Sequence, residues 1–195
     1  MNETLKLGLI LLLIAGIAGC LLSVVNMVTE EPIEAAELYA KSSPEVANAV
    51  CPGSSKIESF DEELNKTIKT DNEKFVEVRK CKDDNGNVLG YGISTLSTVK
   101  GYGGDVEVIV GVSMDGKITG VKVTGHKETP GLGANIELPK FQSQFIGRSV
   151  DEQIVASKTA SADNEIQCLG GATYSSKSFT SAVNNALDIY NKFLK

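Results

Sequence analysis

An uninterrupted apolar stretch near the N-terminus constrains this chain more than any other feature. Residues 7–28 pass without a charged side chain, and about 20 apolar residues are enough for a helix to cross the hydrocarbon core of a bilayer. Lys6 precedes the stretch, and Glu30, Glu31 and Glu34 follow it. Because basic flanks stay in the cytoplasm, we expect a single-pass anchor in the cytoplasmic membrane, with the N-terminus inside and the remaining chain on the extracytoplasmic side.

Two other fates of this stretch are considered. A cleavable signal peptide has a shorter apolar core and a polar segment after its cleavage site. Residues 17–20, Ile-Ala-Gly-Cys, also resemble a lipobox, in which Cys20 would be lipidated and become the new N-terminus. Residues 21–28 stay apolar after Cys20, where a lipoprotein usually turns polar. The pattern therefore favours an uncleaved anchor over residues 1–29.

Composition narrows the class of the remaining chain. The 195 residues are 42% hydrophobic and 23% charged, which suits one globular domain with a short additional element. A net charge of -6 argues against a nucleic-acid partner, which selects for basic patches. His126 is the only histidine, and this excludes most zinc sites, which need several histidines or a spaced cysteine set.

The four cysteines, Cys20, Cys51, Cys81 and Cys168, form no Cys-x-x-Cys pair. Neither a redox dithiol nor a zinc knuckle is therefore encoded locally. Since Cys20 lies in the apolar stretch, the other three permit at most one internal disulfide. We expect mainly buried or free thiols, and a disulfide such as Cys51 to Cys81 is the alternative that an oxidising compartment would allow.

The pattern after the anchor predicts an α+β fold. Residues 32–48 carry apolar positions at helical spacing, a break follows at 51–55, and residues 56–72 suit a short helix or a loop, so 30–74 is expected to be a helical or linker region. Residues 75–81, 88–98, 106–113 and 117–124 read as four strands of an antiparallel meander. Apolar residues then recur at three- and four-residue spacing over 176–193, which predicts a C-terminal helix with Ser175 or Ser176 as its N-cap.

Two stretches are unusual for a plain sheet domain. Residues 126–133 read His-Lys-Glu-Thr-Pro-Gly-Leu-Gly, and Pro130-Gly131 fits the centre of a type II turn. Residues 170–173 read Gly-Gly-Ala-Thr at the entry to the final helix. Small residues let a bulky ligand approach the backbone, and a helix N-terminus favours phosphate. Physical chemistry alone permits a plainer interpretation, a connecting loop and a Gly-rich turn.

Together, in this order and behind one anchor helix, these stretches resemble the FMN-binding subunits of ion-pumping respiratory complexes. The likeness is to the G subunit of the Rnf complex, a ferredoxin:NAD oxidoreductase, with the C subunit of the sodium-pumping NADH:quinone oxidoreductase as a longer relative. The markers are residues 100–104, Lys-Gly-Tyr-Gly-Gly, with residues 126–133 and 170–173. The resemblance covers roughly residues 75–194 and the anchor, so it implies an FMN-binding domain over 75–195.

The resemblance implies a covalent cofactor, with the phosphate of FMN esterified to Thr173 by a separate magnesium-dependent flavin transferase. It further implies that Glu128, Thr129, Gly131 and Leu132 line the flavin, while Gly171, Ala172, Ser175 and Lys177 complete the cofactor-binding set. Gly170 stands where the family has Ser or Thr, and Gln167 stands where an Asp often precedes the motif. Both departures lie in the part that a transferase would read.

The function implied is that of a non-autonomous electron-transfer subunit, which works with the other subunits of a membrane redox complex. We find no nicotinamide-binding motif and no iron–sulfur cysteine framework in the sequence. Three alternatives stay open: a subunit of the quinone-reductase type, a noncovalent flavin in another reductase, and a membrane-anchored binding module without redox chemistry.

Overall fold

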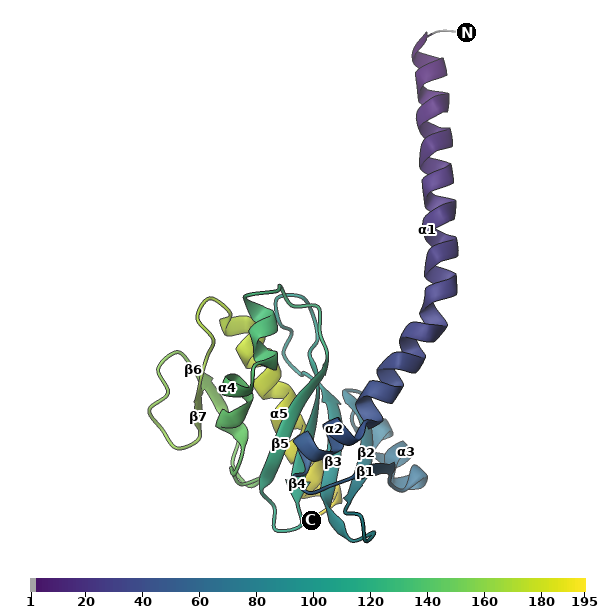
Figure 1. Ribbon diagram of the computed structural model, residues 1–195. Coiled ribbons are helices and arrows are strands. Elements are labelled where there is room, and N and C mark those ends of the chain that lie inside the picture. The colour runs from purple at the N-terminus through teal and green to yellow at the C-terminus, as the bar shows by residue number, and fades with distance from the viewer. Residues whose placement is uncertain (1–2) are drawn as a thin grey trace. The chain divides into compact units, whose positions relative to one another are not determined.

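The computed structural model describes residues 3–195, except for the side chains of Thr4 and residues 29–42. Two compact units result, Met1–Lys41 and Ser42–Lys195. The first is built by helix α1 (Glu3–Ser42), in which Leu5–Val28 has a mean hydropathy of 2.7 and is long and apolar enough to cross a membrane (Figure 1). The expected apolar helix is therefore confirmed. The side chains of Glu30, Glu31 and Glu34, used to predict its orientation, lie outside the described residues.

The helix expected over residues 32–48 is present but interrupted. Helix α1 ends at Ser42, and a short helix α2 (Pro44–Val50) follows. Ser43 caps α2, since its hydroxyl accepts a hydrogen bond from the N–H of Val46 at 3.3 Å. Pro44 has no N–H and disfavours helical backbone at the residue before it, so the interruption falls at Ser43.

An antiparallel sheet forms the centre of the second unit. Its strands lie in the order β1-β2-β3-β4-β5. Their bounds are β1 Lys56–Ser59, β2 Phe75–Lys82, β3 Val88–Leu96, β4 Glu107–Ser113 and β5 Ile118–Gly125. The last four confirm the predicted meander. Residues 56–72, expected as a short helix or a loop, hold both strand β1 and helix α3 (Glu62–Asp71), whose N-cap is Asp61.

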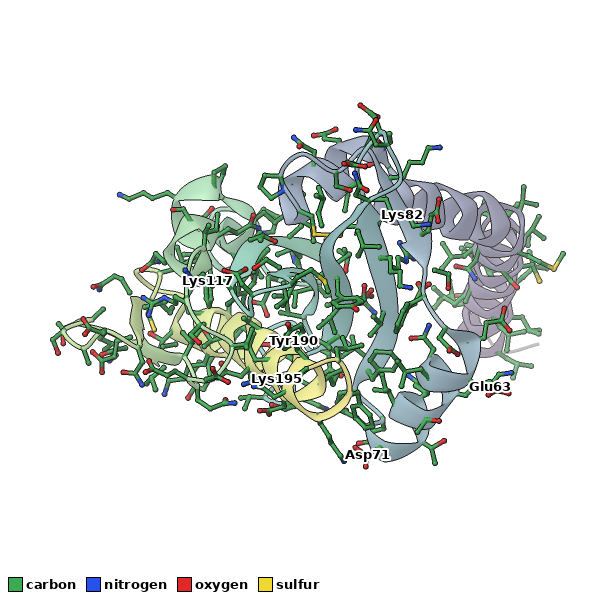
Figure 2. All side chains as sticks on the ribbon, turned by 90° about the horizontal axis from the view of Figure 1, so that it is seen from below. Glu63, Asp71, Lys82, Lys117, Tyr190 and Lys195 are labelled. Atoms are coloured by element: carbon green, nitrogen blue, oxygen red, sulfur yellow. A yellow bond between two sulfur atoms is a disulfide. The ribbon has the colours of Figure 1, made fainter. Side chains whose placement is uncertain are left out.

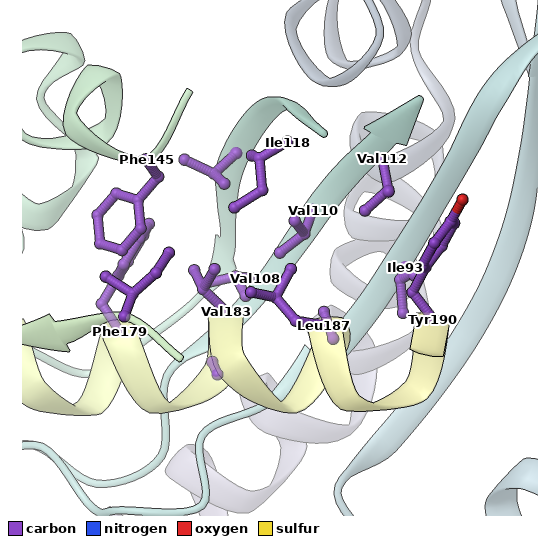
Figure 3. Close-up of a cluster of buried hydrophobic side chains, with 14 of the residues drawn as sticks. Ile93, Val108, Val110, Val112, Ile118, Phe145, Phe179, Val183, Leu187 and Tyr190 are labelled. Atoms are coloured by element: carbon purple, nitrogen blue, oxygen red, sulfur yellow. The ribbon is translucent and has the colours of Figure 1, made fainter. Parts of the chain in front are cut away.

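Helix α5 (Thr173–Phe193) covers one face of this sheet and closes the main core. Alternate residues of β4, namely Val108, Val110 and Val112, point toward the helix (Figure 3). The helix contributes apolar side chains at the spacing that the sequence predicted. These are Phe179, Val183, Ala186, Leu187 and Tyr190, all buried. Burying this stripe against the strands removes apolar surface from water, which stabilises the fold.

Helix α2 packs against the opposite face of the sheet, at a place where two glycines leave room for it. Gly111 of β4 and Gly120 of β5 are direct cross-strand partners. A Cβ on Gly111 would lie 1.9 Å from the carbonyl oxygen of Val50, and one on Gly120 would lie 2.1 Å from that of Ala49. The hydroxyl of Thr119 donates to the same Val50 oxygen at 2.7 Å. The end of α2 therefore lies directly against the sheet backbone.

A disulfide between Cys51 and Cys81 joins the residue after α2 to strand β2; Figure 2 draws it as a yellow bond. Our expectation of mainly free or buried thiols was wrong for this pair, and only Cys20 and Cys168 are free. The sequence pattern does not reveal that α2 folds back onto the sheet, which is what brings Cys51 to Cys81. Both sulfurs lie in a small second core with Ile57 and Ile109.

The chain between β5 and α5 is a run of short elements that the sequence did not predict individually. They are the 3-10 helices η1 (Gly133–Glu137) and η2 (Ser143–Phe145), helix α4 (Pro139–Gln142), and the parallel strands β6 (Val155–Ser157) and β7 (Glu165–Gln167). Arg148 joins them, because its guanidinium donates to the carbonyl oxygens of Gln144 at 2.6 Å and Glu165 at 2.8 Å.

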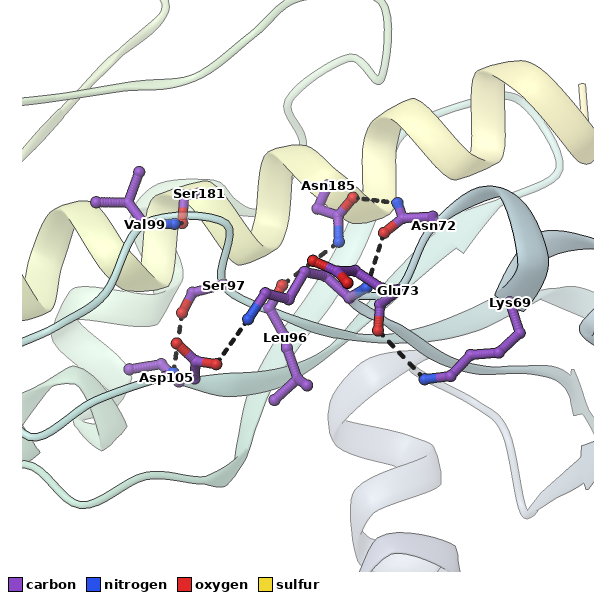
Figure 4. Close-up of polar contacts among 11 residues, drawn as sticks. Lys69, Asn72, Glu73, Leu96, Ser97, Val99, Asp105, Ser181 and Asn185 are labelled. Carbon is purple, nitrogen blue, oxygen red and sulfur yellow. Dashed lines mark hydrogen bonds and ion pairs between the residues drawn. The ribbon is translucent and has the colours of Figure 1, made fainter.

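A polar network attaches the segment after β3 to the middle of α5 (Figure 4). The buried Asn185 accepts from the Asn72 amide at 2.6 Å and donates to the carbonyl of Leu96 at 3.4 Å. One helical turn earlier, the Ser181 hydroxyl accepts from the N–H of Val99 at 3.1 Å. These contacts hold the beginning of the loop of residues 97–105 against α5.

Candidate functional site

Three loops far apart in the sequence meet around one cavity of about 320 Å³. They are the loop between β3 and β4, the loop after β5, and the entry to α5. The residues that line the cavity are Tyr102, Glu128, Thr129, Leu132, Gly133, Gly171, Ala172, Thr173, Tyr174 and Ser175. The two stretches singled out in the sequence therefore form a single site, to which residues 101–104 also contribute.

The loop after β5 contains the type II turn that the sequence predicted. The N–H of Leu132 donates to the carbonyl of Thr129 at 3.1 Å, which closes the turn around Pro130 and Gly131. Gly131 has a φ of 77°, a conformation that costs a glycine little. The turn places Thr129 and Leu132 on the cavity wall, while Gly131 itself does not line the cavity.

The carboxylate of Glu128 lies where the three loops meet. One oxygen accepts from the Ser175 hydroxyl at 2.7 Å, and the other accepts from the N–H of Gly103 at 3.1 Å. Only 5% of the residue is exposed. On the sheet side, the N–H of Glu128 donates to Nδ1 of His126 at 3.0 Å, and Nε2 of His126 contacts Glu137 at 2.8 Å. The single histidine thus supports the loop.

The start of α5 differs from the predicted one. The helix begins at Thr173 with Ala172 at the N-cap, and no side chain caps it. Ser175 and Ser176 were expected as caps, but both lie in the first turn of the helix. Their hydroxyls are engaged elsewhere: Ser175 donates to Glu128, while Ser176 donates to the Ala172 carbonyl at 2.9 Å. The first N–H groups of α5 therefore stay available to an anion from outside the helix.

A second cavity, of about 530 Å³, also borders the Gly-rich turn at residues 170–171. Its lining residues are Lys158, Gln167, Cys168, Leu169, Gly170, Gly171, Thr173 and Tyr174. Thr173 thus borders both cavities. Burial raises the pKa of the Cys168 thiol above its ordinary value, although a hydrogen bond with Ser176 and the charges of Lys177 and Lys158 act against this shift.

Seven of the nine residues that we expected at the cofactor line the first cavity, and two do not. Gly131 shapes the turn, and Lys177 is exposed one helical turn beyond Thr173. Sequence reasoning missed Tyr102, Gly133 and Tyr174. Tyr102 and Tyr174 are 81% and 71% exposed at the cavity. The sequence places both tyrosines beside Gly-rich turns, but their exposure at the cavity is a property of the fold and could not be read from the sequence.

The fold and this site define a class of protein, an α+β domain with a cavity at the entry to its last helix. Residues 101–188 match the family described as the FMN-binding domain. The crystal structure of the C subunit of the Na(+)-translocating NADH-quinone reductase from Parabacteroides distasonis shares this fold, with a TM-score of 0.58 at 18% identity, over 78% of this chain and 92% of that one.

Two relatives are closer in sequence. The G subunit of the Na(+)-translocating ferredoxin:NAD(+) oxidoreductase complex of Acetobacterium woodii is 37% identical over 97% of this chain and 93% of its own length. The G subunit of the proton-translocating complex of Clostridium ljungdahlii is 35% identical over 66% of this chain and 70% of its own. The chain belongs to the family of G subunits of ion-translocating ferredoxin:NAD(+) oxidoreductase complexes, as its motifs indicated.

Proposed function

We propose that this chain is a membrane-anchored electron-transfer subunit of an ion-translocating ferredoxin:NAD(+) oxidoreductase, and that it carries FMN through a phosphoester on Thr173. The observation that carries the proposal is the position of this hydroxyl. Thr173 is the first residue of α5, borders both cavities, and makes no hydrogen bond with its hydroxyl in the described part of the chain. It is therefore free to accept a phosphoryl group.

The residues around Thr173 fit the parts of FMN. The uncapped start of α5 offers N–H groups and the positive end of a helix dipole to a phosphate. The cavity of about 320 Å³ lies at the lower end of the range for ligand pockets, roughly 300–1,000 Å³, which suits a ring system held at the surface. Leu132, Tyr102 and Tyr174 would cover its apolar faces.

When bound, FMN supplies one-electron and hydride-level redox chemistry, which no side chain of the protein can perform. The chain binds the phosphate at α5, orients the ring between the loops, and leaves one side of the site open to a redox partner. A covalent bond keeps the cofactor from diffusing away outside the cell. The other subunits of the complex would supply and remove the electrons.

Formation of the bond needs help from outside the chain. The Thr173 oxygen would form a bond to phosphorus and lose its proton, while the pyrophosphate bond of FAD breaks and AMP leaves. In the described residues, no carboxylate or imidazole contacts the Thr173 hydroxyl to take that proton. This supports a separate flavin transferase as the catalyst.

The test is the denatured intact mass of the full chain after coexpression with a flavin transferase. We expect one FMN-sized addition in the wild-type chain, none in Thr173→Ala, and an unchanged addition in the matched control Thr159→Ala, which removes a hydroxyl that lines neither cavity. An unmodified wild-type mass would remove the covalent proposal. A flavin that binds but is lost on denaturation would favour noncovalent FMN.

The predicted side of the membrane belongs to the same proposal. The disulfide between Cys51 and Cys81 supports an oxidising location for the domain, since cytoplasmic thiols are kept reduced. Lys6, ahead of the apolar segment, supports an N-terminus inside the cell. The flavin would then face the extracytoplasmic side.

A further inference from the structure

We infer that Glu128 is a positioning residue. It fixes the three loops of the site relative to one another, so that the Thr173 hydroxyl lies at a preformed cavity. Glu128 has this role before any cofactor arrives, and its consequence for flavin attachment rests on the proposed function. The resemblance assigned Glu128 to the flavin lining, whereas the contacts in the structure direct its carboxylate toward the protein.

Each carboxylate oxygen contacts a different loop. The bond from the Ser175 hydroxyl, at 2.7 Å, reaches the third residue of α5, two residues beyond Thr173. The bond from the Gly103 N–H, at 3.1 Å, reaches the loop between β3 and β4. Hydrogen bonds to a buried charged group are stronger than neutral ones, and the loss of one partner leaves the other unsatisfied. A single side chain thus connects the three loops.

The glycines of the site are arranged around this side chain. A Cβ on Gly101 would lie 2.1 Å from one carboxylate oxygen, and a Cβ on Gly133 would lie 2.3 Å from the other. A Cβ on Gly103 would lie 1.9 Å from the carbonyl oxygen of Lys127, the residue before Glu128. The loops therefore approach the carboxylate as closely as only glycine permits. This gives a structural reason for glycine at positions 101, 103 and 133.

The orientation of Glu128 is itself constrained. Its own N–H donates to Nδ1 of His126, so the ring proton of this histidine is assigned to Nε2, which faces Glu137 at 2.8 Å. The type II turn follows directly after it. The backbone of Glu128 is therefore fixed on both sides, and its carboxylate reaches α5 from a rigid support. The position of Thr173 is then set by Ser175, which shares its helical turn.

The test compares four variants of the full chain, first without flavin. Glu128→Ala removes both bonds, and Glu128→Gln keeps an oxygen for Gly103 and an N–H for Ser175. Ser175→Ala removes the bond to α5 alone. Glu152→Gln is the control, because it changes an exposed glutamate that lines neither cavity. Amide hydrogen exchange is followed in peptides that cover residues 100–104 and the start of α5.

We expect Glu128→Ala to exchange about tenfold faster in both segments, Ser175→Ala to do so only at the start of α5, and the other two variants to resemble wild type. Flavin attachment, measured as denatured mass after exposure to the transferase, should fall at least tenfold in Glu128→Ala and return in Glu128→Gln. Unchanged exchange in both Glu128→Ala and Ser175→Ala would overturn the inference. Should Glu128→Ala fail to fold, the segment-specific effect of Ser175→Ala decides.

The two proposals fail separately. If the wild-type chain accepts no flavin while Glu128→Ala still loosens both segments, the positioning role stands and the proposed function falls. If flavin attaches equally well to wild type and Glu128→Ala, the positioning role falls and the carrier function stands.

Discussion

At the scale of single residues, the glycines of the site matter as much as its larger side chains, because they leave room for those side chains. Glu128 occupies space that a methyl group on Gly101 or Gly133 would need. Gly170, by contrast, faces open space, with no heavy atom within 4 Å of the position that a Cβ would take. Equal changes of glycine to alanine in one site should therefore have very different effects.

We predict that Gly133→Ala lowers the free energy of unfolding by about 1–3 kcal/mol, because its Cβ would lie 2.3 Å from the Glu128 carboxylate and 2.5 Å from the Ser175 hydroxyl. Gly170→Ala, its control, should stay within about 0.5 kcal/mol of wild type. Urea unfolding of the full chain in detergent, followed by circular dichroism, measures both. Equal stability of the two variants would contradict the packing described here.

A second prediction at this scale concerns Cys168. Burial raises the pKa of its thiol, so the thiolate should form at higher pH than in a small free thiol. The rate of alkylation by iodoacetamide, measured against pH in a Cys20→Ser background, should reach half of its maximum at higher pH than for a model thiol. A midpoint at or below the model value would refute the shift.

The same shift has a consequence for stability. Below the ordinary thiol pKa, folded and unfolded chains both keep the Cys168 proton. Between that value and the raised folded pKa, the unfolded chain loses its proton first. The contribution of Cys168 to the free energy of unfolding therefore declines as pH rises through this alkaline window, and a Cys168→Ser variant should lose that part of the pH dependence.

At the scale of elements, the sequence predicts strands and helices whose apolar residues recur at regular spacing. It does not predict elements that depend on contacts with distant parts of the chain. The strands β2 to β5 and helix α5 carry regular apolar patterns, and they were predicted to within a few residues. Strand β1 has four residues and a single buried side chain, Ile57, so no alternation marks it. Ser175 resembles an N-cap by its place, but Glu128, 47 residues earlier in the chain, engages its hydroxyl.

The features of the site also separate into local ones, which the sequence predicts, and ones that depend on distant contacts, which it does not. The type II turn at Pro130 and Gly131 is local and was predicted from two residues. The approach of Tyr102 to this site depends on the contact of residues 97–105 with α5, which no local pattern encodes. The disulfide is the same kind of case, because Cys51 lies beside Cys81 through the packing of α2 over Gly111 and Gly120, which are distant in sequence.

This disulfide supplies a prediction at the element scale. Its cysteines are 30 residues apart, and closing a loop of that length stabilises a fold by about 3–4 kcal/mol on the chain-entropy account. The double variant Cys51→Ser/Cys81→Ser should lose about that much in urea unfolding, and dithiothreitol should lower only the stability of wild type. If reduced and oxidised wild type unfold at the same urea concentration, the disulfide does not stabilise the fold.

At the scale of the whole molecule, one apolar helix and one FMN-binding domain share a chain whose relatives are subunits of ion-translocating complexes. The N-terminal segment is long and apolar enough to cross a membrane, and the second unit holds the cavity at the start of α5. Such a division suits a subunit that passes electrons among neighbours and performs no complete reaction alone.

The predicted topology is testable on the intact chain. With the domain on the extracytoplasmic side, a C-terminal alkaline phosphatase fusion should be active in cells, and a C-terminal green fluorescent protein fusion should be dark. Reversing the flanking charge, with Lys6→Glu and lysines at positions 30 and 31, should weaken this preference. Fluorescent cells with inactive phosphatase would place the domain in the cytoplasm.

The central claim is that Thr173 carries FMN through a phosphoester, and tandem mass spectrometry of one tryptic peptide tests it most directly. Cleavage after Lys158 and Lys177 releases residues 159–177, which also contain Thr159, Ser161, Tyr174, Ser175 and Ser176 as competing hydroxyls. In the chain purified from its native host, we predict one FMN-sized addition on this peptide, with the fragments assigning it to Thr173. An unmodified peptide, or an addition on any of the other hydroxyls, would contradict the account.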